Sequence, residues 1–142
     1  MHGTRRDLII AALWAASPAF TEESKVMGTK SMNNEDIGAV SPALEHYTKE
    51  ALMHGLWKRA ELSPRDRSIV TVAALIARMQ SNEMPYYFAL ALDNGVKPGE
   101  LSEIITHLAF YSGWPNAMAA VSVAREIFRQ RGIGSDHLPP AK

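Results

Sequence analysis

The sequence predicts an all-α fold, a compact domain of about five to seven helices. Three observations lead to this prediction. From residue 41 onward, apolar residues recur every three or four positions, which is the spacing of one helix face. Proline near the start and glycine just past the end mark the limits of most of these segments. No segment alternates convincingly between apolar and polar residues, and no hairpin dipeptide joins two such segments.

The first two expected helices each begin at a serine–proline pair. Ser41 is the expected cap of a helix that ends or is interrupted at Gly55. Ser63 caps the second helix, where the carboxylate of Asp66 favours the positive end of the helix dipole. The second helix is apolar on nearly every side up to Ile76, which predicts that it is deeply buried.

We expect three more helices, each ended by a glycine. The first runs over residues 83–93 and is stopped by Gly95. The second begins at Pro98 and stops at Gly113, and the third begins at Trp114 and stops at Gly132.

The predicted domain organisation has four parts. Residues 41–131 form the helical domain, residues 20–40 a polar arm or linker, and residues 132–142 a flexible tail. Residues 1–19 place Arg5 and Arg6 before a short apolar run, which fits a twin-arginine-type signal peptide or an N-terminal helix. This run is too short to span a membrane. The expected location is therefore periplasmic or exported with a cleaved signal, and cytoplasmic without one.

Composition excludes several classes of function. Basic and acidic residues number 15 each, so the net charge is zero, unlike the basic footprint of a nucleic-acid-binding protein. Zero charge also leaves self-association open. Cysteine is absent, which excludes disulfides, thiolate nucleophiles and iron–sulfur ligation. Phosphate-binding loops, dinucleotide fingerprints, serine-nucleophile elbows and zincin motifs are missing as well.

His107 is the first candidate for acid–base chemistry. It lies at the edge of the apolar face of its helix, four residues after Glu103, where a histidine can titrate near neutral pH. A core histidine satisfied by Glu103 explains the same spacing, and spacing alone favours that explanation. The two residues also have the spacing of two metal ligands, but that face offers no third ligand, so we predict no metal site.

Glu83 and Tyr87 are the second candidates. They are four residues apart and share a helix face, where a carboxylate in apolar surroundings could act as a base. A first-turn carboxylate beside a core tyrosine is the alternative, and the sequence alone favours it. Arg65 and Arg67 open a helix that soon becomes apolar, so one of them is a candidate to turn inward toward a carboxylate. Solvated charge is the commoner outcome at a helix end.

Several segments between about residues 41 and 130 share their order and spacing with a known family. They are Leu56-Trp57-Lys58-Arg59, Leu62–Ser68, Val70–Ile76, Glu83-Met84-Pro85, Ala91–Gly95, Glu100, Glu103-Ile104, His107, Tyr111–Pro115 and Ala117. Together they resemble the carboxymuconolactone decarboxylase family, within the alkyl-hydroperoxidase-D-like superfamily.

The resemblance implies an oligomerising subunit, in trimers or hexamers, that removes CO2 from a small carboxylated lactone or enol acid without a cofactor. The residues that it implies for catalysis are His107, Glu83 and Tyr87. The residues that it implies for substrate binding are Arg67, Trp114 and Tyr111. Glu83 and Tyr87 would face His107 across a pocket between the third and fourth expected helices.

Two positions depart from the family pattern. Tyr87 stands where members commonly have a histidine, and a phenol is a far weaker base, with a pKa of about 10 against about 6.5. It can still donate a hydrogen bond to an enolate, so a related lactone or enol chemistry is as plausible as the original decarboxylation. The redox cysteine pair of the peroxidase branch would fall at Gln80 and Glu83, which excludes a thiol peroxidase.

Two hypotheses follow. The first is a decarboxylase whose partner is a small-molecule substrate. The second is a non-catalytic helical oligomer that binds a hydrophobic small molecule. We expect Glu83, Tyr87 and His107 to line one pocket under the first hypothesis. Neither hypothesis involves nucleic acid or membrane integration. Candidate subunit contacts are Trp14, Leu56 and Trp57.

Overall fold

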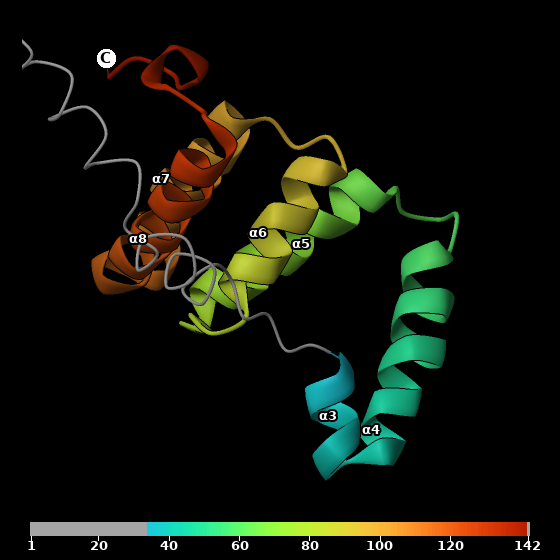
Figure 1. Cartoon of the computed structure of the whole chain (residues 1–142). Coiled ribbons are helices and arrows are strands. Elements are labelled where there is room, and N and C mark those ends of the chain that lie inside the picture. The colour runs from blue at the N-terminus through green and yellow to red at the C-terminus, as the bar shows by residue number, and fades with distance from the viewer. Residues whose placement is uncertain (1–33, 142) are drawn as a thin grey trace, which may run out of the picture. The chain divides into compact units, whose positions relative to one another are not determined.

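The computed structural model describes residues 34–141, so the predictions for residues 1–33 lie outside the described part. All regular elements in the described part are helical, which confirms the all-α prediction (Figure 1). In chain order they are α3 (Asn34–Val40), α4 (Pro42–Tyr47), the π-helix η1 (Thr48–Gly55), the 3-10 helix η2 (Leu56–Lys58), α5 (Pro64–Ala77), α6 (Met84–Asp93), α7 (Pro98–Ser112), α8 (Trp114–Arg131) and the 3-10 helix η3 (Ser135–His137).

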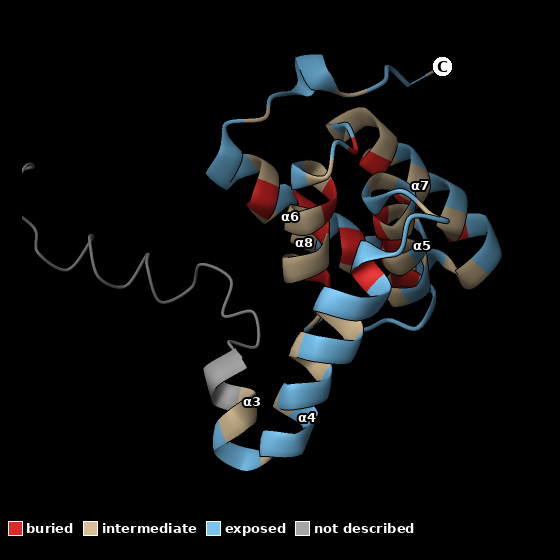
Figure 2. Ribbon diagram, turned by 90° about the vertical axis from the view of Figure 1, so that its right-hand side faces the viewer, coloured by how far each residue is buried: buried red, intermediate tan, exposed pale blue. Residues whose placement is uncertain are grey.

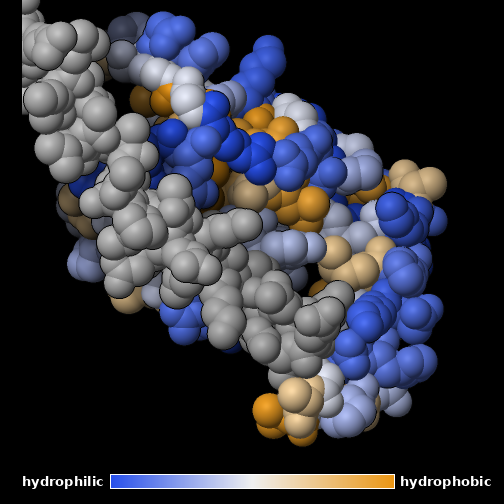
Figure 3. Space-filling view, viewed as in Figure 1, coloured by the Kyte–Doolittle hydropathy of each residue, from blue (hydrophilic) through white to orange (hydrophobic). Residues whose placement is uncertain are grey.

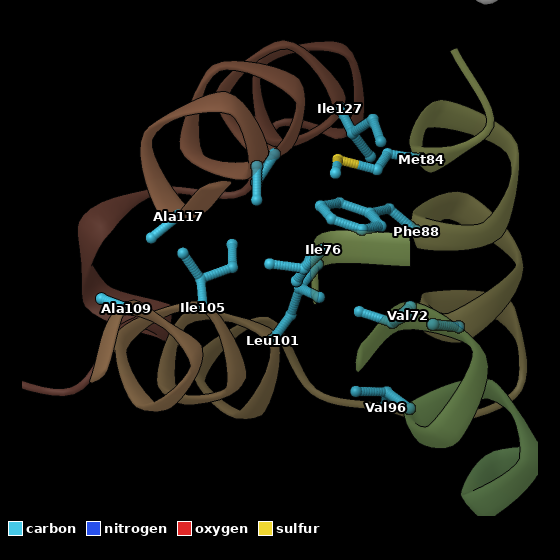
Figure 4. Close-up of a cluster of buried hydrophobic side chains, with 13 residues drawn as sticks. Val72, Ile76, Met84, Phe88, Val96, Leu101, Ile105, Ala109, Ala117 and Ile127 are labelled. Atoms are coloured by element: carbon cyan, nitrogen blue, oxygen red, sulfur yellow. The ribbon is translucent and has the colours of Figure 1, made fainter. Parts of the chain in front are cut away.

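Four helices, α5 to α8, enclose the hydrophobic core. Helices α5 and α8 each pack against both α6 and α7, so α6 and α7 lie diagonally opposite each other (Figure 4). Phe88 of α6 and Leu101 of α7 both reach the centre of the core and are fully buried. Burying a side chain of this size contributes about 1.5–3 kcal/mol. The diagonal of the bundle is therefore filled with apolar side chains.

Local signals place the helix ends where the sequence predicts them. The Ser63 hydroxyl accepts the backbone N–H of Asp66 at 3.0 Å, which is the expected cap of α5. Gly113 and Gly132 end α7 and α8 with φ of +99° and +64°, a region that favours glycine. The expected cap at Ser41 is wrong in one respect, because its side chain makes no capping hydrogen bond within the described residues.

The helices before α5 bury little of their surface. Neither α4 nor η1 contains a buried residue, and Val40, the last residue of α3, is 88% exposed (Figure 2). Apolar surface is therefore open to solvent at this turn (orange in Figure 3). Residues 34–40, the end of the expected polar arm or linker, form α3. Helices α4 and η1 follow without a break and end at Gly55, where the sequence predicts that the helix ends or is interrupted.

The chain after Gly132 turns back along α7 and α8. It forms η3, and the half-buried Leu138 lines a pocket together with residues of both helices. Within residues 34–141, no helix combines the length and the apolar character that a membrane crossing requires.

Candidate active site

Tyr87 of α6 lies in an aromatic cluster that long-range packing creates. Its ring stacks on Trp57 of η2, with ring centroids 6.2 Å apart and an interplanar angle of 21°. Tyr86 meets Tyr87 edge-on at 5.0 Å. Trp57 is only 9% exposed, so the indole forms one buried wall beside the phenol.

The surroundings keep the Tyr87 phenol protonated. Burial raises the pKa of Tyr87 above its usual value, and the nearby Tyr86 and Glu83 raise it further. Glu83 is half-buried and occupies the N-cap position of α6, but its side chain makes no capping hydrogen bond within the described residues. A neutral phenol and a carboxylate thus lie one helical turn apart, as the sequence predicts.

Arg67 turns inward at the start of α5. Its Nη2 donates hydrogen bonds to the backbone carbonyls of Arg59 and Leu62, both at 3.3 Å. These bonds hold the turn that follows Trp57. The Arg67 Nε is buried and has no hydrogen-bond partner among the described residues, so the guanidinium retains an unused donor. Arg65 behaves differently, because it forms an ion pair with Glu100 at the start of α7.

Trp57 and Glu83 both lie beside Tyr87, and Arg67 binds the turn that follows Trp57. We use the name Trp57–Tyr87 site for the set of Trp57, Arg67, Glu83 and Tyr87. It offers an apolar wall, a protonated phenol, a carboxylate and a cation with a spare donor. Groups of this kind can hold a small organic anion, support charge on an oxygen and transfer a proton.

His107 lies elsewhere, on an exposed part of α7. Its ring stacks on Tyr111, one turn along the same helix, at 4.5 Å. Phe110 and Trp114 pack edge-to-face at 6.0 Å beside them. Tyr111 is 77% exposed and Trp114 is 62% exposed. We call these four residues the His107 surface, and it includes both predicted substrate-binding aromatics.

The expected geometry, with Glu83 and Tyr87 facing His107 across a pocket, is wrong within one subunit. Helices α6 and α7 are diagonal in the bundle, and core side chains such as Phe88 fill the space between them (Figure 4). The alternative of a core histidine satisfied by Glu103 is also wrong, because His107 is exposed and stacks on Tyr111. The catalytic and binding roles themselves stay predictions.

Sequence reasoning missed the role of Trp57. It predicted a subunit contact, whereas the structure buries the indole against Tyr87 of its own chain. Leu56, the other described candidate for a contact, is 47% exposed. The available signal was a tryptophan between Leu56 and two basic residues, because tryptophan is highly buried on average. Within the described residues, no three His, Asp or Glu side chains gather as metal ligands.

The fold defines a small all-α protein, and its candidate sites carry carboxylate, phenol and imidazole side chains. The chain belongs to the carboxymuconolactone decarboxylase family, whose family model matches residues 42–126. It is 30% identical over 115 residues to a 4-carboxymuconolactone decarboxylase of Acinetobacter baylyi, which covers 80% of this chain and 86% of that protein. It is also 30% identical over 71 residues to a nitrosuccinic acid decarboxylase of Metarhizium robertsii, which covers 50% of each chain. These matches confirm the family predicted from the sequence.

Proposed function

We propose that this protein is a cofactor-free decarboxylase of a small carboxylated lactone or enol acid, and that the reaction takes place at the Trp57–Tyr87 site. The observation that carries the proposal is the buried, unpartnered Nε of Arg67 close to the turn that holds Trp57. A buried donor without a partner costs about 1–3 kcal/mol, which an anionic substrate would offset by accepting its hydrogen bond.

The names of the two relatives support the same reaction class. Each substrate carries a carboxylate and an electron acceptor, a lactone carbonyl in one and a nitro group in the other. When the bond to the carboxylate carbon breaks, CO2 leaves and the electron pair passes into the acceptor oxygen. A proton then returns to carbon. A decarboxylase of this kind needs an anchor for the substrate, a donor for the oxyanion and one proton source.

The chain offers one residue for each role. Arg67 is the anchor, since its unused Nε can donate a charge-assisted hydrogen bond to a carboxylate. Tyr87 donates to the oxyanion, because its raised pKa keeps the phenol protonated. Glu83 lies one turn before Tyr87 and is the proton-transfer group within the same subunit.

His107 is the partner of Glu83 in the acid–base pair, and it enters the reaction only through assembly. Within one chain α6 and α7 are diagonal, so His107 requires a neighbouring copy to meet the Trp57–Tyr87 site. We propose a homo-oligomer that buries the His107 surface, because exposed aromatic residues clustered at one place are typical of an interface. Light scattering that found only monomer at micromolar concentration would contradict this assembly.

A substrate screen tests the proposed function. Unsaturated lactone carboxylates and nitro dicarboxylates are offered to the purified protein, and released CO2 is measured. We expect turnover that falls at least about tenfold in Tyr87→Phe, because the oxyanion loses one donor. Tyr86→Phe is the matched control and keeps its rate. If no compound releases CO2 while several bind, the non-catalytic oligomer becomes the better description.

A further inference from the structure

A pocket opens between α7, α8 and the chain that follows α8. Its volume is about 450 Å³, within the range of small-molecule sites. None of its lining residues belongs to the Trp57–Tyr87 site. The apolar part of the lining comes from α7, α8 and the C-terminal segment, and consists of Ile105, Val121, Ala124, Phe128, Ile133 and Leu138.

The charged side chains that line the pocket are all positive. Arg125 and Arg129 both line the pocket, and no acidic residue does so among the described residues. Arg129 pairs with Glu126 at 2.6 Å, so its charge is largely balanced. Arg125 is exposed and forms no ion pair or hydrogen bond with any described residue, although the charge of Glu126 acts on it at longer range, so its guanidinium can still pair with a ligand at the apolar cavity. The hydroxyls of Ser102 and Ser135 add further donors.

A neighbouring pocket on the other side of the C-terminal segment does not share this positive lining. Leu138 lines both pockets. The neighbouring pocket is lined by acidic Glu100, Glu103 and Asp136 beside Lys97. It therefore lacks the cationic bias, although it is of similar size, at about 600 Å³.

We infer that the pocket between α7 and α8 binds a monocarboxylate with an apolar body, such as a medium-chain fatty acid. The carboxylate pairs with Arg125, and the apolar body lies on Ile105 and Phe128. A neutral molecule would form no charge-assisted hydrogen bond with Arg125, and a dicarboxylate would place a charge on the apolar floor. This site is separate from the proposed decarboxylation and does not depend on it.

Octanoate and octanol are suitable probes, because they share an alkyl chain and differ in charge. Calorimetric titration of the full chain with octanoate is expected to show one saturable site per chain. Octanol is expected to bind at least about tenfold more weakly, since it forms no charge-assisted hydrogen bond. Octanoate is also expected to raise the melting temperature, because it binds only the folded state.

Three variants locate the binding site. Arg125→Gln should weaken octanoate binding about tenfold or more, whereas Arg78→Gln removes an equal charge outside the pocket and should leave it unchanged. Thr106→Trp places an indole into the pocket from an exposed helix position and should abolish binding. Arg67→Gln should have no effect, because Arg67 belongs to the other site.

Several outcomes would overturn the inference. They are equal affinity for octanoate and octanol, equal affinity in Arg125→Gln and Arg78→Gln, or loss of binding in Arg67→Gln. The last result would place the fatty acid at the Trp57–Tyr87 site. Failure of the wild-type chain to bind octanoate, together with a changed oligomer size in Thr106→Trp by light scattering, would assign the pocket to contact with a second copy. Loss of decarboxylation without loss of octanoate binding would affect the proposed function alone.

Discussion

Predicted site residues lie in two aromatic stacks, one formed by long-range packing and one formed within a single helix. The Trp57–Tyr87 stack joins η2 to α6 across 30 positions of sequence, with Trp57 almost buried. The His107–Tyr111 stack lies within one turn of α7 and is exposed. Folding of one chain completes the first stack. The second presents its rings outward, which suits a surface that meets another molecule.

The largest expected difference between the two stacks is in the free energy of unfolding that is lost when one of their rings is removed. Trp57→Ala removes a buried indole and should lower the free energy of unfolding by about 3 kcal/mol or more. Tyr111→Ala should change it by less than about 0.5 kcal/mol in dissociated subunits, because the ring is exposed. Urea denaturation of both variants at low protein concentration measures the difference. Equal losses would mean that the His107 surface is already packed within the single subunit.

His107→Gln tests the exposed stack through activity. We expect the decarboxylation rate to fall about 100-fold or more, while the melting temperature changes little because His107 is exposed. Glu103→Gln, an exposed position one turn away, should keep the rate. A variant that loses about 1–3 kcal/mol of stability and keeps its activity per folded molecule would assign His107 a structural role.

Mixed oligomers sharpen the His107 prediction. If His107 of one copy serves the Trp57–Tyr87 site of another, oligomers mixed from His107→Gln and Arg67→Gln chains should regain part of the activity. Some of their sites then combine two intact residues. No recovery on mixing would place all the catalytic groups within one copy.

Arg67→Gln tests the buried stack and should have a somewhat smaller effect. Loss of a charge-assisted contact with the substrate should lower kcat/KM by about 10- to 100-fold, mainly through KM. Arg65→Gln is the matched control, because Arg65 pairs with Glu100 and its side chain is 39% exposed. If both variants lose the same activity, the effect comes from the start of α5 in general and Arg67 is no anchor.

Local features of this fold could be predicted from the sequence. The Ser63 cap needs only the amide of Asp66, three residues along, and the end of α8 needs only a glycine with positive φ. Tyr87 and Glu83 share a face because any helix brings residues four apart together. Each of these features depends on a few consecutive residues, which the sequence displays directly.

The long-range features could not be predicted in the same way. Helical periodicity shows which face of α7 is apolar, but it does not show which helices lie beside it. Tyr87 and His107 were expected to face each other, whereas the packing order places their helices on a diagonal. The stack of Trp57 on Tyr87 depends on where the turn before α5 returns, and hydrogen bonds from Arg67 to two carbonyls set that turn. Such contacts join segments that no sequence spacing relates.

The smallest expected change in stability is at the C-terminal end of α6, away from the aromatic stack. The aromatic stack holds the first turns of α6, whereas Asp93 in the last turn pairs with Arg131 of α8 at 2.7 Å. The hydrogen bond from Arg131 lowers the pKa of Asp93 below its usual value. A lowered folded-state pKa gives stability that is present above the unfolded pKa, about 3.9, and is lost as the pH falls through the folded value.

Asp93→Asn should therefore cost stability at neutral pH but not in acid. Because the Asp93 side chain is 60% exposed, water screens the pair, and the loss should stay below about 1 kcal/mol. The difference in melting temperature between wild type and Asp93→Asn should shrink as the pH falls below about 4 and vanish once Asp93 is protonated in both states. High salt at neutral pH should shrink it as well. A difference that persists unchanged in acid would mean that the asparagine disturbs the end of α6 sterically, and that this end, like the aromatic stack, is held by packing and not by charge.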